Sequence, residues 1–321
     1  MATQVIQNPG QNGSTGDRLA GFLKIFAGEV LTAFSRTTKT MDKHIVRTIT
    51  NGKSASFPVM GRTIGKYLAP GNSLDDQRNV ILHNEQIIPI DGLLTSDVLI
   101  TDIDDAMLHY DVRGEYSKQL GEALAMAADG AVLAEMALLT ANTENLPGLG
   151  AGGKIELKSV TAIGVADPAV GQEILSSLAQ ARMVLGKLYV PNADRYFFVT
   201  PEAYSSILCA LMPNSANYAA IIDPETGNLR NIHGFEIIEV PHFELGGADG
   251  KHAFPTALKG KMVGLAVHRS AVGTVKLKDL ALERARRAEF QADQIIAKYA
   301  MGHKGLRPEA AVAIMVKGYA A

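Results

Sequence analysis

Apolar residues recur at helical spacing close to the start of the chain. They follow Asp17, a residue type suited to the N-cap position, and comprise Leu19, Phe22, Leu23, Phe26, Val30 and Phe34. The spacing predicts an amphipathic helix from Asp17 to about Ser35. Residues 2–16 are almost all small and polar and predict a flexible arm, because they have little apolar surface to bury. The helix either packs in the chain's own core or docks on a neighbouring subunit.

Residues 43–90 carry an extended pattern. A short apolar group at Phe57, Val59 and Met60 follows a Ser-Ala-Ser run, and a second apolar run covers residues 81–90. Glycine and proline punctuate the stretch between them. The pattern predicts a long two-stranded hairpin, and such a ribbon usually rests on another surface because it is marginally stable alone.

Residues 115–139 are the strongest helix candidate in the chain, because Ala, Leu, Met and Glu dominate them. At 1.5 Å per residue this helix is a rod of roughly 38 Å. One face carries an apolar seam of Leu120, Leu124, Ala127, Ala131, Ala134 and Leu138. On the opposite face a spacing of seven stacks Glu115, Glu122 and Asp129, and we expect this acidic rail to face solvent or a partner.

After residues 146–148 the pattern alternates between strands and helices. Asp167-Pro168 predicts the start of a helix that ends near Gly186, and Thr200-Pro201 predicts the start of another that Pro213 stops. Apolar runs predict strands at residues 155–160, 196–199, 235–240, 262–267, 295–301 and 310–316. We expect a second domain of mixed sheet and helix, since 321 residues allow about two domains.

Charge is balanced over the whole chain but divided locally. The 31 Lys and Arg residues against 33 Asp and Glu residues leave a net charge of -2, which gives no bulk attraction to nucleic acid or to an acidic membrane. Residues 91–135 contain ten acidic residues against two basic ones, a local net charge of -8. Residues 43–74 contain no acidic residue and five basic ones, Lys43, Arg47, Lys53, Arg62 and Lys66. The two stretches predict complementary surfaces, which meet either within one chain or between neighbouring chains.

The glycine-rich stretch at residues 148–153 is the nearest approach to a nucleotide-binding motif. Gly148, Gly150 and Gly153 fit the dinucleotide-binding spacing. They follow a predicted helix and precede a predicted strand, whereas a phosphate-binding loop leaves a strand and opens a helix. We therefore expect a flexible linker here and no cofactor.

Metal and catalytic patterns are also weak. The acidic cluster at Asp102, Asp104 and Asp105 lacks the glycine and the terminal Glu of a calcium loop, and carboxylates are common at helix starts. The eight histidines are scattered, and the single cysteine, Cys209, cannot form an internal disulfide. No apolar run exceeds seven residues, far below the roughly 18 that span a bilayer. We expect no catalytic residue, no metal site and no membrane partner.

Many short runs in the chain are similar to the major capsid proteins of short-tailed, lytic, autographivirus-type bacteriophages, and the resemblance is nearly full-length. Each run alone is weak, but together they are specific to that family. The arm before Asp17 and the glycine-rich stretches near residues 148 and 247 match poorly, so nothing is carried over to them. The matching runs are GEVLTAF at 28–34, GKSASFP at 52–58, YLAPG at 67–71, IDGLL at 90–94, LAMAADG at 124–130, ALMP at 210–213, NYAA at 217–220, HRSAVGT at 268–274, RARRA at 284–288, IAKYAMG at 296–302 and LRPE at 306–309.

The resemblance implies an α+β fold of the Johnson type, the capsid fold shared by tailed phages and herpesviruses. It implies a division into an N-terminal arm, an extended β-hairpin loop, a peripheral domain with a long spine helix, and an α/β axial domain. On this chain the arm falls at residues 1–48, the extended loop at 49–92, the peripheral domain at 93–150 and 265–306, and the axial domain at 151–264 and 307–321.

The same resemblance implies a non-enzymatic major capsid protein. Its hexamers and pentamers would tile an icosahedral shell, assembled in the host cytoplasm, that encloses double-stranded DNA without sequence-specific binding. A scaffolding protein and a portal protein at one vertex are the implied partners besides further copies of the chain. Two alternatives stay open, a cellular nanocompartment of the same fold with enzyme cargo and a cytosolic α/β enzyme that uses the glycine-rich loop.

In such relatives the extended loop lies over the peripheral domain of an adjacent subunit. On this chain the loop would bring Lys53, Arg62 and Lys66 to the acidic rail of a neighbour as inter-subunit contacts. We expect Glu122→Lys combined with Asp129→Lys to impair assembly and to leave monomer folding nearly intact, because exposed helix charges contribute at most about 1 kcal/mol to folding.

Overall fold

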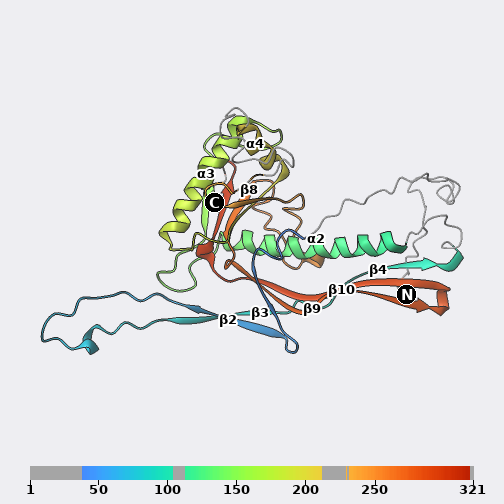
Figure 1. Ribbon diagram of the computed structural model, residues 1–321, viewed down its shortest axis with the longest axis horizontal. Coiled ribbons are helices and arrows are strands. Elements are labelled where there is room, and N and C mark those ends of the chain that lie inside the picture. Colours follow the sequence, from blue (N-terminus) through green and yellow to red (C-terminus); the bar gives the residue numbers. More distant parts are fainter. Residues whose placement is uncertain (1–37, 104–112, 212–228, 230, 319–321) are drawn as a thin grey trace.

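The structure is a computed structural model that describes residues 38–103, 113–211, 229 and 231–318. The predicted amphipathic helix at residues 17–35, the arm before it and the stop at Pro213 lie outside these residues. Figure 1 shows three parts: an α/β body around β8, a long helix lying along a twisted sheet, and a hairpin that reaches away from both.

A five-stranded mixed sheet forms the centre of the α/β body. Its strand order is β5-β11-β8-β6-β7, with β11 parallel to β5 and antiparallel to β8, and β6 antiparallel to β8 and parallel to β7. The strands are β5 (Gly153–Glu156), β6 (Arg195–Val199), β7 (Glu236–Glu239), β8 (Met262–His268) and β11 (Ala311–Met315). Each predicted strand of this region is confirmed, although β5 begins and ends before the predicted segment.

Helices cover both faces of this sheet. Because side chains alternate along a strand, Phe197 and Phe198 of β6 are both fully buried yet belong to separate apolar clusters. Phe197 packs in the cluster that includes α3 (Pro168–Lys187) and α4 (Pro201–Leu211), while Phe198 packs with the C-terminal half of α2 (Arg113–Leu139). The predicted start of α3 is confirmed, since the Asp167 carboxylate accepts a hydrogen bond from the Ala169 N–H at 2.8 Å.

A second, four-stranded sheet lies along α2. Its order is β1-β9-β10-β4, and its strands are β1 (Ile45–Thr48), β4 (Leu94–Thr101), β9 (Val272–Arg287) and β10 (Ala292–Gly305). Strands β9 and β10 form a long antiparallel ribbon with register shifts near Ala300. The charge-rich segment of β9 gave no strand signal in the sequence, because most of its side chains beyond Lys276 are polar or small.

Helix α2 is confirmed, but its single apolar seam is only partly right. Leu120 and Leu124 pack on the four-stranded sheet, and Ala131 and Ala134 are buried as predicted. Leu138 is 38 % exposed, while its neighbours Ala137 and Leu139 are buried. The helix passes from one sheet to the other along its length, so its last turns are buried around most of their circumference and no straight seam describes them.

The predicted hairpin is confirmed. It consists of β2 (Ser54–Met60) and β3 (His83–Pro89), paired antiparallel from Ser54 with Pro89 to Met60 with His83, and a short 3-10 turn, η1 (Leu74–Gln77), lies in the loop between them. At its base, Ala55 and Ile88 pack with Val275 and Leu306. Within the described part of the chain, no helix is both long enough and apolar enough to cross a membrane.

Candidate assembly surfaces and the junction at the base of the hairpin

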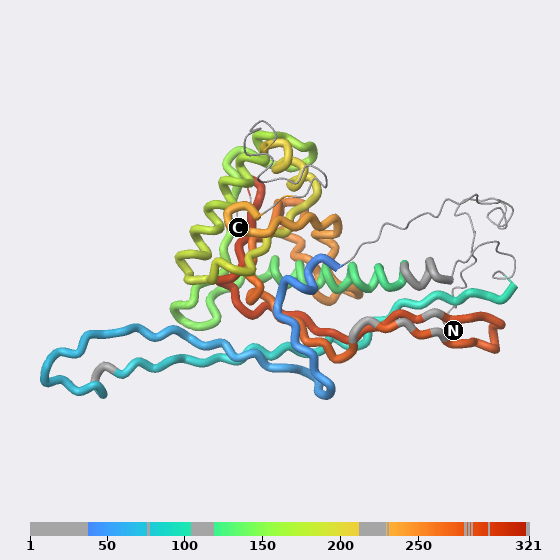
Figure 2. The backbone as a smooth tube through the Cα atoms, viewed as in Figure 1, coloured from blue at the N-terminus to red at the C-terminus, as the bar shows by residue number. Residues whose placement is uncertain are grey.

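The projecting hairpin exposes many large apolar side chains. Ile64 is 73 % exposed and Tyr67 is fully exposed, although both are residues that a lone protein would normally bury in part. Figure 2 shows the segment as a long blue loop that leaves the body on one side. Its exposed apolar members are Met60, Ile64, Tyr67, Leu68, Leu74, Val80, Ile81, Leu82 and Ile87.

The five basic residues predicted to act together divide into two groups. Lys43 pairs with Glu236 at 2.7 Å, and the Arg47 guanidinium donates to the Ser56 carbonyl at 3.0 Å. The Arg62 guanidinium donates to the Leu188 carbonyl at 2.6 Å and lies over the Tyr189 ring, so the structure places Arg62 in contact with its own chain.

Lys53 and Lys66 form the second group. Both are exposed, and neither ammonium group has a carboxylate partner among the described residues. The ammonium groups of these two lysines are therefore accessible on the surface of the hairpin.

The acidic rail is wrong as a single exposed face. The backbone of Glu115 belongs to α2, but its side chain lies outside the described part of the chain. Glu122 is partly buried, and its Oε1 atom has no hydrogen-bond partner among the described residues. Asp129 is completely buried, with 0 % exposure, and therefore cannot face a solvent-exposed partner.

Asp129 instead anchors the segment that leads into β1. Its carboxylate accepts hydrogen bonds from the Lys39 N–H at 2.5 Å, the Thr40 N–H at 3.3 Å and the Thr40 hydroxyl at 2.6 Å, and lies 3.4 Å from His242 Nε2. The expectation that Asp129→Lys spares folding is therefore wrong. A lysine there would bury a charge and leave these donors without an acceptor, which is strongly destabilising.

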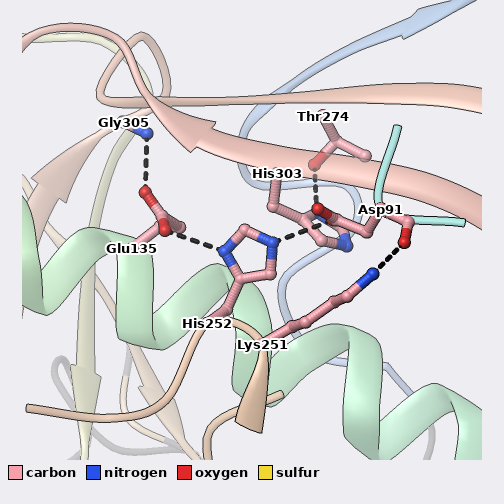
Figure 3. A network of polar contacts seen from close by, with 7 residues as sticks. All are labelled: Asp91, Glu135, Lys251, His252, Thr274, His303 and Gly305. Atoms are coloured by element: carbon pink, nitrogen blue, oxygen red, sulfur yellow. Dashed lines mark hydrogen bonds and ion pairs between the residues drawn. The ribbon is translucent and has the colours of Figure 1, made fainter. Parts of the chain in front are cut away.

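A second carboxylate cluster closes the base of the hairpin. Asp91 follows β3, Glu135 lies in α2, and His252 lies in the loop that joins β7 to β8 (Figure 3). His252 Nε2 is 2.8 Å from Asp91 Oδ2, and His252 Nδ1 is 2.8 Å from Glu135 Oε1. These hydrogen bonds, to Asp91 first and then to Glu135, raise the pKa of His252 to about 9.

Two further oxygens of this cluster also accept hydrogen bonds. Glu135 Oε2 accepts from the Gly305 N–H of β10 at 3.0 Å, and the Lys251 ammonium donates to the Asp91 carbonyl. A cavity of about 100 Å³ opens beside the cluster, and Tyr299 and His303 of β10 contribute to its lining. Four separate elements therefore converge on a few polar side chains.

A buried chain of hydrogen bonds continues from this junction toward the N-terminal segment. His44 Nδ1 lies 2.7 Å from the Thr40 carbonyl, which can only accept, so Nδ1 carries the proton. His44 Nε2 then accepts from the Thr274 hydroxyl at 2.6 Å, and His303 Nδ1 donates to that hydroxyl oxygen at 2.9 Å. All donors and acceptors match when both histidines are neutral.

Burial keeps these two histidines neutral. Loss of hydration lowers the pKa of His44 to about 4. The same effect, followed by repulsion from His44 once it is protonated in acid and from His252, lowers the pKa of His303 to about 3. The rings of His252 and His303 are 5.7 Å apart, so one charged and one neutral histidine lie side by side.

The linker interpretation of the glycine-rich stretch agrees with its geometry. Gly148 and Gly150 have positive φ angles of 83° and 102°, and their N–H groups donate to Glu144 Oε2 at 3.1 and 3.4 Å. A carboxylate occupies the position that a phosphate would need. Asp102 pairs with Arg286, while Asp104, Asp105, His109 and Asp111 lie outside the described residues. Among the described residues no group of three or more metal-ligating side chains is arranged to hold an ion.

No local spacing of residues predicted the histidine junction. Glu135 and His252 are 117 positions apart, and Asp91 and His252 are 161 apart, so no local spacing connects them. One indication was the glycine-rich stretch 246–250 just before His252, because glycines allow two backbone segments to approach closely. Indeed, a Cβ atom on Gly130 of α2 would lie 2.1 Å from the Gly246 carbonyl oxygen.

Comparison with known proteins identifies the family of this fold. The model of the Gp10A-like major capsid protein family matches residues 56–315. The major capsid protein of Escherichia phage T7 is 59% identical, with 95% of this chain and 94% of that protein covered, and that of Enterobacteria phage T3 is 58% identical, with 98% and 96% covered.

A solved structure agrees with this match. The capsid structure of the cyanophage P-SCSP1u superposes with a TM-score of 0.76 at 33% sequence identity and covers 98% of this chain and 99% of that chain. The mixed α+β architecture and the sequence match over nearly the full length of the chain agree with each other. The chain belongs to the Gp10A-like family of major capsid proteins, the non-enzymatic proteins that form the icosahedral shells of T7-like tailed phages.

Proposed function

We propose that this chain tiles the shell as hexamers and pentamers in which the hairpin of one copy lies over the α2 region of the next. The observation that carries the proposal is the row of large apolar side chains on residues 60–87, which the described elements of the same chain leave exposed. A ribbon of this kind is marginal alone and gains stability when its apolar face is covered.

The charge pattern supports the same arrangement. Lys53 and Lys66 remain exposed on the hairpin, and Glu122 of α2 is partly exposed. Charges of opposite sign at an interface speed encounter and fix register more than they add affinity. We therefore assign the inter-subunit role to Lys53, Lys66 and Glu122, with Glu115 at the matching position one heptad before Glu122, and withdraw it from Asp129.

The two sheets support the division of the chain into four functional parts. We assign residues 1–48 to the arm, 49–92 to the extended loop, 93–150 and 265–306 to the peripheral domain, and 151–264 and 307–321 to the axial domain. The four-stranded sheet with α2 supports the peripheral domain, and the five-stranded sheet supports the axial domain. Strand β8 runs to His268, so the sheet membership would move the boundary at 264/265 by four residues.

We further propose that the shell encloses double-stranded DNA and that its assembly uses a scaffolding protein and a portal protein at one vertex. These partners come from the family alone. The net charge of -2 is consistent with a container that does not bind phosphates strongly along its inner surface.

Charge reversal tests the hairpin contact. Lys53→Glu combined with Lys66→Glu should reduce the yield of particles, counted by electron microscopy of the chain expressed with its scaffolding protein. The free energy of unfolding of the unassembled variant should lie within about 1 kcal/mol of the wild-type value, because both side chains are exposed.

The matched control exchanges two lysines outside the hairpin. Lys187→Glu combined with Lys259→Glu makes the same charge change at exposed positions of the axial region and should leave the particle yield unchanged. Normal particles from the hairpin variant would refute the charge contact and leave the family assignment intact. Adding Glu122→Lys to the hairpin variant should restore part of the lost yield if the charges face each other.

A further inference from the structure

One imidazole ring ties the base of the hairpin to α2, in addition to the apolar packing of Ala55 and Ile88 on Val275 and Leu306. Asp91 lies two residues beyond the end of β3, and His252 connects it to Glu135 of α2 through two contacts of 2.8 Å each. A neutral imidazole has one N–H and can donate to only one of two carboxylates. Both contacts are satisfied together only when the ring is protonated, so the bridge contains a proton that the geometry itself requires.

The backbone next to this bridge can bend. Gly92 has a φ angle of 116°, which is readily adopted by glycine and rarely by other residues. On the other side, Gly302 of β10 lies so close that a Cβ atom there would be 1.9 Å from the Pro89 carbonyl oxygen. The return strand of the hairpin is therefore fixed over a few residues, Pro89 to Gly92, and the rest of the hairpin extends from this short segment.

We propose that His252 is a proton-dependent clasp that sets the direction of the hairpin relative to the α/β body. With the imidazolium present, Asp91 is tied to α2 and the hairpin has one orientation. When the proton leaves, one of the two carboxylates loses its donor and two negative charges lie on either side of the ring. The tie between Asp91 and α2 is then lost, and the direction of the hairpin depends on the remaining contacts of its base, the apolar packing of Ala55 and Ile88 and the Asp91 N–H bond to the Met301 carbonyl. The titratable and charged groups that face His252 are Asp91, Glu135, His303, Tyr299, Lys251 and Asp249.

The pKa values agree in sign with this device. His252 has its pKa raised to about 9, so the clasp is closed at neutral pH and opens as the pH rises through about 9. Burial raises the pKa of Tyr299 to about 12, so this neighbour stays neutral over the same range. The device concerns a single copy of the chain and is independent of how the copies tile.

A spin-label distance measurement tests the clasp in the full-length, unassembled chain. One label goes on Asn72→Cys in the hairpin loop and the other on Gln180→Cys in α3, both exposed positions, in a Cys209→Ser background. Helix α3 is a fixed reference because it packs on the five-stranded sheet that also carries α2. All variants carry Arg62→Ala, which removes the contacts of this hairpin side chain with Leu188 and Tyr189.

At pH 7 we expect one narrow distance distribution for this parent and a broad one for His252→Gln. At pH 10 the parent should broaden to match the variant, with a midpoint near pH 9, while His252→Gln should not change further. His83→Gln, which removes an exposed histidine from β3 itself, is the matched control and should behave as the parent.

Identical distributions for the parent and His252→Gln at pH 7 would overturn the proposal. So would a parent distribution that stays narrow through pH 10 while circular dichroism shows the chain folded. If His252→Gln does not fold, the titration of the parent decides alone, and Asp91→Asn should then move the midpoint to lower pH because the imidazolium loses one negative partner.

Discussion

Three histidines within one junction show how a single residue type takes opposite charge states a few ångströms apart. His252 stays charged because two carboxylates accept from it, whereas burial keeps His44 and His303 neutral. The difference lies in the hydrogen-bond acceptors and in hydration, which sequence spacing does not encode. For this reason the eight histidines seemed scattered in the sequence although several of them meet in the fold.

The neutral pair makes the protein sensitive to acid. In the folded chain the pKa values of His44 and His303 are about 4 and about 3, whereas in the unfolded chain each lies near 6.5. As the pH falls from 6.5 toward these values, the unfolded chain binds protons that the folded chain does not. The free energy of unfolding therefore falls over this range, and the melting temperature should decrease steadily from pH 6.5 to pH 4.

Calorimetry of two variants separates this effect from general acid denaturation. His303→Gln should lose less stability than the wild type over that pH range, because one of the two titrating groups is gone. His83→Gln should lose as much as the wild type, since His83 is exposed on β3. Equal acid sensitivity in His303→Gln and the wild type would show that the buried pair is not responsible.

At the level of elements, the sequence predicted those that depend on local signals. Asp167-Pro168 capped α3 as expected, and the residue composition predicted α2 and the hairpin. Strand β9 and the burial of Asp129 were missed for a shared reason. Both depend on which surface an element meets in three dimensions, and the argument from heptad spacing assumed that α2 has one free face along its whole length.

The contact between α3 and α4 depends on the absence of a side chain at one position. A Cβ atom on Gly171 would lie 2.1 Å from the Ser206 carbonyl oxygen, a backbone atom that cannot move away by itself. Gly171→Ala should therefore push the helices apart and lower the free energy of unfolding by about 1–3 kcal/mol, measured by chemical denaturation.

Gly186 in the same helix provides the opposite result. It is exposed, and a Cβ atom there would have no neighbour within 4 Å. Gly186→Ala should raise the free energy of unfolding by up to about 1 kcal/mol, because alanine loses less backbone entropy in a helix. If both variants raised the free energy of unfolding, the close approach at Gly171 would have to relax without cost.

For the whole molecule, we expect folding and assembly to use different parts of the chain. The large apolar clusters lie around the two sheets and α2, whereas the hairpin loop beyond Met60 adds exposed apolar residues. Replacing residues 62–81 with a short Gly-Ser linker should leave the melting temperature of the unassembled chain nearly unchanged, because β2 and β3 keep their pairing and their buried base.

The same replacement should abolish closed shells, measured as the loss of megadalton particles in gel filtration. A linker variant that still forms complete particles would show that the hairpin loop is dispensable for tiling. A variant that unfolds would instead show that the loop supports its own chain.

The strand order of the larger sheet also determines when in synthesis the central sheet can be completed. Strand β11 lies between β5 and β8, and all five of its residues are buried. It is nevertheless the last of the described strands in the sequence. While a ribosome is still adding residues 311–315, β5 has no neighbour on that side and the centre of the body is open. We therefore expect copies still under synthesis to be poor building blocks, because their central sheet is not yet closed.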